Sequence, residues 1–251
     1  MCKKKLFIII LFTSVLSFGQ IVNIESLRKP TDTSRFVGSV KFDVDLTKNV
    51  NTFFSLRNEI TLQYTSGKNL FLFLNNIVFT EINTNKFTDK SIQHLRYNYQ
   101  FNTRTTFEIF TQFQRDKVSF INLRALFGLG TRFQLFLSKK NNAFLGTLIM
   151  YEHENSVGNI NDVIDKATRG NIYFSFRLNL KNNLFLSSVT YYQPKLNNFS
   201  DFRVSSETSF SFELIKNLAL VTSFSYQLDK FPVLGIPNSQ YSLLNGIQYT
   251  F

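Results

Sequence analysis

The chain has 251 residues and a formal net charge of +11, with 30 phenylalanines, no tryptophan and one cysteine. Its hydrophobic fraction of 43% is ordinary for a globular protein. After residue 19 no stretch approaches the roughly 18 consecutive apolar residues of a membrane-spanning helix, so a helical inner-membrane protein is excluded. Because the lysines and arginines are scattered singly among acids, the basic charge does not indicate a nucleic-acid partner.

The N-terminus has the pattern of a secretory signal peptide. Three lysines, Lys3 to Lys5, precede an apolar run that starts at Leu6, and Ser-Phe-Gly follows before Gln20. We expect residues 1–19 to be removed, which leaves a short periplasmic segment at 20–34 and a folded region at 35–251. Cys2 leaves with the signal peptide, so the mature chain has no disulfide and no thiolate chemistry.

From residue 35 onward, apolar and polar residues alternate. In "RFVGSVKFDVDL" (35–46), Phe36, Val40 and Phe42 share one face of a strand, and Lys41 and Asp43 share the other. Twelve such runs follow one another: 35–46, 52–64, 69–81, 91–101, 104–116, 119–136, 143–154, 169–180, 183–193, 200–214, 217–228 and 240–251. The third and ninth runs alternate less regularly, so their pattern does not determine which face points inward.

The connections between the runs differ in length. Short Asn- and Lys-rich connections such as 102–103 and 181–183 alternate with longer ones such as 83–90, 153–168 and 194–200. This asymmetry is typical of outer-membrane barrels, which have short periplasmic turns and longer external loops. A soluble β-sandwich or lipocalin-like barrel also alternates, but does not readily combine twelve long runs with this asymmetry. The sequence therefore predicts an all-β fold: a single transmembrane antiparallel up-and-down β-barrel of about twelve strands.

The last strand carries a further indication. "YSLLNGIQYTF" places Tyr249 and the terminal Phe251 on one apolar face. A terminal phenylalanine after an alternating aromatic strand resembles the sorting signal of the bacterial barrel-assembly machinery. We therefore predict that Tyr249 and Phe251 form an assembly signal, with that machinery as a partner.

Four stretches resemble a known family: "FTQFQRDKV" (110–118), "LRALFGLGTRF" (123–133), "GTLIMYEHE" (146–154) and "YYQPKLNNFSDFRVSSETSF" (191–210). They are similar to the domain-of-unknown-function family 481, bacterial outer-membrane barrels sometimes labelled salt-induced outer-membrane proteins. The likeness runs over about residues 35–251. It implies a barrel fold and an outer-membrane location, and it brings no substrate and no catalytic residues.

If the polar faces point inward, cations and anions of nearly equal number line the lumen. Ion pairs could then fill a twelve-stranded lumen or leave a narrow path, because buried charges require partners. The residues predicted to line the lumen are Arg57, Glu59, Arg96, Glu108, Arg124, Arg132, Arg177, Asp201, Arg203, Glu207 and Glu213.

Enzyme chemistry is weakly indicated. His94 has Arg96 at the next position on its face, which is not an arrangement for a serine nucleophile. His153 stands beside Glu152 and Glu154 at the start of the longest expected loop. That cluster could bind a divalent cation or supply a base, but the pattern favours a hydrated loop.

These patterns predict an outer-membrane β-barrel protein of a Gram-negative bacterium, a monomer that contacts outer-membrane lipid and lipopolysaccharide. We expect a small porin-like channel or envelope protein with a charged, ion-paired lumen, which is not an enzyme and has no cofactor, metal or nucleic-acid partner. The alternatives are a non-conducting structural or adhesive barrel and a lipid-modifying enzyme.

Overall fold

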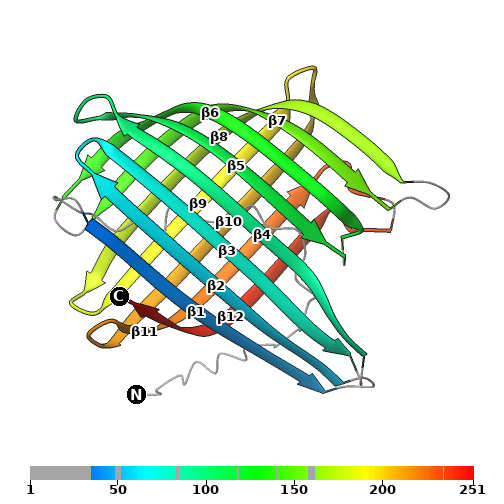
Figure 1. Ribbon diagram of the computed structural model, residues 1–251, viewed down its shortest axis with the longest axis horizontal. Coiled ribbons are helices and arrows are strands. Elements are labelled where there is room, and N and C mark those ends of the chain that lie inside the picture. The colour runs from blue at the N-terminus through cyan, green and yellow to red at the C-terminus, as the bar shows by residue number, and fades with distance from the viewer. Residues whose placement is uncertain are drawn as a thin grey trace, which may run out of the picture.

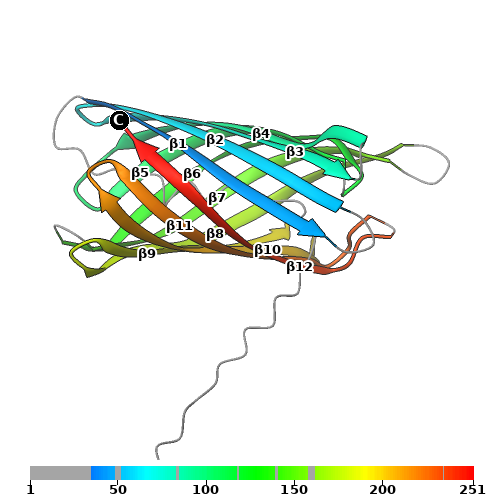
Figure 2. The same cartoon turned by 90° about the horizontal axis from the view of Figure 1, so that it is seen from below.

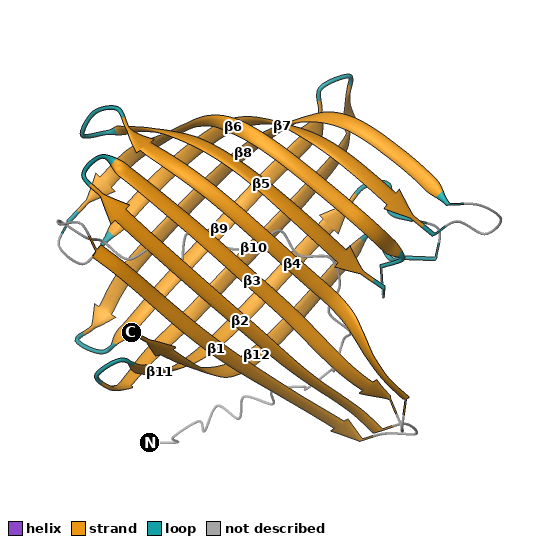
Figure 3. Ribbon diagram, viewed as in Figure 1, coloured by secondary structure: helices purple, strands orange, loops and turns teal. Residues whose placement is uncertain are grey.

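The computed structural model describes residues 35–48, 52–82, 85–117, 119–138, 141–157, 162–233 and 235–251. In this part of the chain, twelve antiparallel strands form one closed barrel, in which each strand pairs with its sequence neighbours and β1 pairs with β12 (Figures 1 and 3). The predicted fold class is confirmed, whereas residues 1–34 lie outside the described residues. No helix in the described ranges is long and apolar enough to cross a membrane. The strands are β1 Arg35–Lys48, β2 Thr52–Ser66, β3 Asn69–Ile82, β4 Asn85–Gln100, β5 Thr105–Asp116, β6 Ile121–Leu137, β7 Asn142–Ser156, β8 Val163–Lys181, β9 Leu184–Lys195, β10 Asn198–Ile215, β11 Leu218–Asp229 and β12 Ser239–Thr250.

The alternation places polar residues inside the barrel and apolar residues outside. In β5, Glu108 and Asp116 are fully buried at 0% exposure, whereas Phe113 on the opposite face is 50% exposed. A soluble sheet would bury the phenylalanine instead. The third run alternates irregularly because β3 is apolar on both faces: it turns Leu72 and Leu74 inward and Phe73 outward.

Several loops are shorter than the sequence predicts. The expected loops at 83–90, 153–168 and 194–200 were too long, since β4 starts at Asn85, β8 at Val163 and β10 at Asn198. Polar outward residues such as Lys166 and Thr168 lie within β8. The loss of apolar character therefore marks where the apolar band ends, while backbone pairing continues beyond it.

We call the end of the barrel that holds the C-terminus the proximal end, and the opposite end the distal end. The proximal connections comprise residues 67–68, 101–104, 138–141, 182–183 and 216–217, and the distal ones 49–51, 83–84, 117–120, 157–162, 196–197 and 230–238. The two longest connections are both distal. The predicted asymmetry is therefore present but smaller than expected.

The seam between the first and last strands is short. β1 pairs with β2 from Arg35 to Lys48, but its ladder with β12 runs only from Ser39, opposite Thr250, to Asp43, opposite Gly246. At the proximal end, Gly38 and Phe251 exchange two backbone hydrogen bonds of 2.9 Å. A Cβ at Gly38 would overlap the ring of Phe251, so the ring can lie over this position because it is a glycine. Figure 2 shows β1 and β12 diverging from there towards the distal end.

The two faces of β10 can be compared directly. Phe210 is 48% exposed on the outer face, and its neighbour Ser211 points inward and lines a cavity. Phe210→Arg should lower the free energy of unfolding by about 2–4 kcal/mol, because lipid cannot solvate the guanidinium. Ser211→Arg is the control and should cost much less. The measurement is urea unfolding in lipid vesicles, and equal costs at both positions would contradict the facing.

The last residue contributes to closure of the seam. Deleting Phe251 removes its two backbone hydrogen bonds to Gly38 and the ring that covers this glycine. The fraction of folded barrel, measured by its heat-modifiable migration on gels, should fall severalfold. Phe251→Ala keeps the two backbone hydrogen bonds and removes only the ring, so it separates the contribution of the ring from that of the hydrogen bonds. An undiminished yield from the deletion would show that Phe251 is dispensable for closure.

Candidate functional site in the barrel interior

The centre of the distal half of the interior is a carboxylate surrounded by arginines. Glu152 on β7 is completely buried. Its Oε2 lies 2.6 Å from Nη2 of Arg124, and its Oε1 lies 3.3 Å from Nε of Arg169 and 2.8 Å from Nη1 of Arg203. These three arginines come from β6, β8 and β10, so one side chain links three strands across the lumen. A buried carboxylate is tolerated because such charged hydrogen bonds replace its hydration.

Other acids balance the same arginines. Arg203 also contacts Glu154 at 3.2 Å and Asp229 at 2.7 Å, and Arg169 contacts Asp201 at 3.2 Å. We name this set the Glu152 cluster. Because acids and bases alternate through it, the cluster presents neither sign of charge continuously along the lumen. Its members are Arg124, Glu152, Glu154, Arg169, Asp201, Arg203 and Asp229.

A second ion pair lies on β4 and β5. Nη1 of Arg96 is 3.2 Å from Oε2 of Glu108, and the Tyr173 hydroxyl donates a 2.7 Å hydrogen bond to the same carboxylate oxygen. His94 is buried beside this pair, with its Nδ1 3.0 Å from the Gln112 Oε1 atom. These contacts hold the His94 ring in place beside the Arg96–Glu108 pair.

An apolar and aromatic layer fills part of the interior. It consists of Phe110, Leu126, Leu148, Met150, Tyr173, Val189 and Tyr191. Two glycines make room for its rings, because a Cβ at Gly128 would overlap Phe110 and a Cβ at Gly146 would overlap Tyr173. Gly128 and Gly146 therefore relieve crowding on the lumen face.

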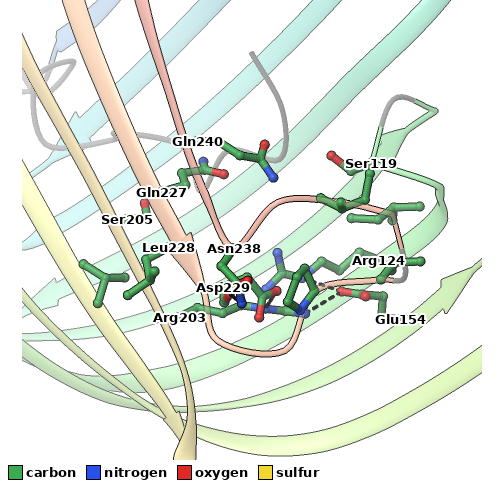
Figure 4. A pocket seen from close by; sticks show the side chains of 15 residues that line it. Ser119, Arg124, Glu154, Arg203, Ser205, Gln227, Leu228, Asp229, Asn238 and Gln240 are labelled. Atoms are coloured by element: carbon green, nitrogen blue, oxygen red, sulfur yellow. Dashed lines mark hydrogen bonds and ion pairs between the residues drawn. The ribbon is translucent and has the colours of Figure 1, made fainter. Parts of the chain in front are cut away.

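Two cavities lie on either side of buried side chains. The distal cavity, of about 70 Å³, is lined by Arg124, Glu154 and Arg203 and by the β11–β12 connection (Figure 4). The proximal cavity, of about 170 Å³, is lined by residues of β1, β2 and β8–β12. Along β11, Gln227 lines the distal cavity and Val221 the proximal one, and Ser223 and Ser225 between them are buried.

The eleven residues predicted to line the lumen are distributed over this interior. Arg124, Asp201 and Arg203 meet in the Glu152 cluster, and Arg96 meets Glu108. The Arg132 guanidinium lies 3.5 Å from the ring centre of Phe144. Buried are Arg57, Arg96, Glu108, Arg124, Arg132 and Asp201; partly buried are Glu59, Arg177, Arg203 and Glu207; exposed is Glu213, on the wall of the proximal cavity.

Sequence reasoning did not predict the cluster. The alternation placed Glu152 on the lumen face near the end of the run 143–154, whereas Glu154 fell within the expected loop 153–168; β7 continues to Ser156 and turns both acids inward. The alternation Tyr151, Glu152, His153, Glu154 was the available signal. Among the described residues, no group of three or more His, Cys, Asp or Glu is placed to hold a metal ion. Arg169 was also missed, although it lies on the same face as Asn171.

Comparisons with known proteins agree with this architecture. The family model described as a protein of unknown function, DUF481, matches residues 31–251. No curated protein matches. A NanC porin structure is similar at a TM-score of 0.52 and 9% identity, covering 85% of this chain and 98% of that one. The outer-membrane channel COG4313 from Pseudomonas putida F1 is similar at a TM-score of 0.51 and 9% identity, covering 89% of this chain and 98% of that one. The translocator domain of the autotransporter NalP from Neisseria meningitidis is similar at a TM-score of 0.50 and 10% identity, covering 90% of this chain and 91% of that one.

Removing the central carboxylate tests the Glu152 cluster. Glu152→Gln leaves Arg124, Arg169 and Arg203 without their shared anion, and breaking a buried pair in this way costs about 3–5 kcal/mol. The free energy of unfolding in vesicles should fall by that amount. His153→Gln, one residue away and outside the buried set, is the matched control and should change little. Equal effects would mean that the cluster contributes nothing specific.

Proposed function

The chain belongs to the DUF481 family, and on that premise we propose that it is a porin-like barrel of the Gram-negative outer membrane with a narrow, ion-paired lumen. The proximal end then faces the periplasm, since this end holds the short turns and the C-terminus. Residues 1–19 direct export. The outward phenylalanines contact lipid and lipopolysaccharide, and Tyr249 and Phe251 engage the barrel-assembly machinery.

The observation that carries this proposal is the buried layer between the two cavities. Tyr173 and Tyr191 are 1% and 2% exposed, and the small Ser223 on β11 is 3% exposed. Side chains therefore occupy the middle of the interior, which limits passage to the smallest solutes and ions. Twelve strands leave little room once such long side chains point inward.

The balanced charges set the expected selectivity. Arginines bound to carboxylates present no continuous positive potential, so neither anions nor cations are strongly favoured. Any conductance is therefore small and weakly selective. A barrel that does not conduct at all and stabilises the envelope is the second candidate, favoured by the three arginines that hold Glu152. No catalytic residues are proposed.

Opening the middle layer separates the two candidates. Tyr173→Ala combined with Tyr191→Ala removes two large interior side chains, so single-channel conductance in planar bilayers should rise severalfold from a small wild-type value. Phe174→Ala, the outward neighbour in β8, is the control and should leave conductance unchanged. A wild type with no conductance would favour the structural barrel, and a large, strongly anion-selective wild-type pore would overturn both.

A further inference from the structure

The proximal cavity contains two opposite charges, on Arg177 and Glu213, that attract each other but form no direct ion pair among the described residues. The Arg177 guanidinium on β8 stacks over the Phe185 ring at 4.8 Å and interacts electrostatically with the Glu213 carboxylate. Glu213 on β10 is exposed on the wall of the same cavity. Phe185 lies on β9, the strand between them.

The other charges of this cavity are occupied. Lys41 lies 3.1 Å from Asp43 and donates a hydrogen bond to Ser223. Glu59 accepts a 3.2 Å hydrogen bond from Asn76. Arg177 and Glu213 interact with each other but are not held in a direct ion pair by the described side chains, so they are the charges of this cavity that a ligand can bridge. In this they contrast with the directly paired Glu152 cluster in the distal half.

We propose that the proximal cavity binds a small zwitterion of the free amino acid class, with its carboxylate on Arg177 and its ammonium group on Glu213. This inference deepens the proposed function, on which it rests for an interior that admits small polar solutes. The volume of about 170 Å³ suits a molecule of this size. Charge-assisted hydrogen bonds at both ends of the ligand would supply most of its affinity.

The charges favour a zwitterion over the other small solutes. A simple anion would be attracted by Arg177 but repelled by Glu213 and Glu59. A simple cation would be attracted by Glu213 but repelled by Lys41 and Arg177. A neutral sugar could use the hydroxyl groups of Ser187 and Ser211 but carries no charge that pairs directly with Arg177 or Glu213. Two opposite charges on one ligand satisfy both sides of the cavity.

The test is a titration of the full mature barrel in detergent micelles with glycine, followed by calorimetry or ligand-observed NMR. Acetate, methylammonium and glucose are the comparison probes, and each should bind at least about tenfold more weakly than glycine. Arg177→Gln and Glu213→Gln should each weaken glycine binding by about tenfold or more. Arg104→Gln, an exposed position in a proximal turn, should leave binding unchanged.

Each outcome is decisive for the cavity. Glycine binding no tighter than that of acetate or glucose, or glycine binding equal in wild type and Glu213→Gln, would overturn the proposal. Because Glu213 is exposed on the cavity wall, its variant should fold normally, as its heat-modifiable migration would verify. Binding does not require conduction, so a failure here is distinguishable from a failure of the porin-like function, which the bilayer recordings test.

Discussion

The whole structure depends on one requirement: in lipid, each backbone N–H and C=O group must bond to a neighbouring strand, because no water is there to do so. A closed ring of strands meets it except at the distal end of the short β1–β12 seam, and closure creates an inside and an outside with opposite needs. The outside takes the phenylalanines. The inside receives every other side chain, and the charges there must find partners among themselves, as Glu152 does with three arginines.

The interior divides into regions of different chemistry. Distally, the arginines are held by acids from neighbouring strands. In the middle, Tyr173 and Phe110 fill space that Gly146 and Gly128 leave open, so large and small residues on adjacent strands fit together. Proximally, the walls carry short hydroxyl side chains, and a cavity remains. The porin-like fold is thus combined with an interior that is packed more like a core than like a channel.

Much of this was readable in the sequence. The alternation in β10, interrupted on its apolar face only by Ser206 and Thr208, gave its faces correctly, because a period of two has only two solutions and burial distinguishes them. The packing of the interior was not readable, because it depends on which residues meet across strands. Tyr173 and Phe110 interrupt polar faces, and only the register shows that each lies against a glycine of a neighbouring strand. The predicted loops were too long for another reason: the strands stay paired beyond the end of the apolar band.

The short seam has a consequence for how this barrel forms. Neighbouring strands are joined by connections of a few residues, so most hairpins can form locally and early. Only β1 and β12 must find each other from opposite ends of the chain, and their ladder offers a handful of pairs between Ser39 and Asp43 to offset that loop-closure entropy. Non-local pairing of this kind is slow. We therefore expect closure of the seam to set the folding rate, and unfolding to begin at the distal end of the seam, beyond the pairs from Ser39 to Asp43.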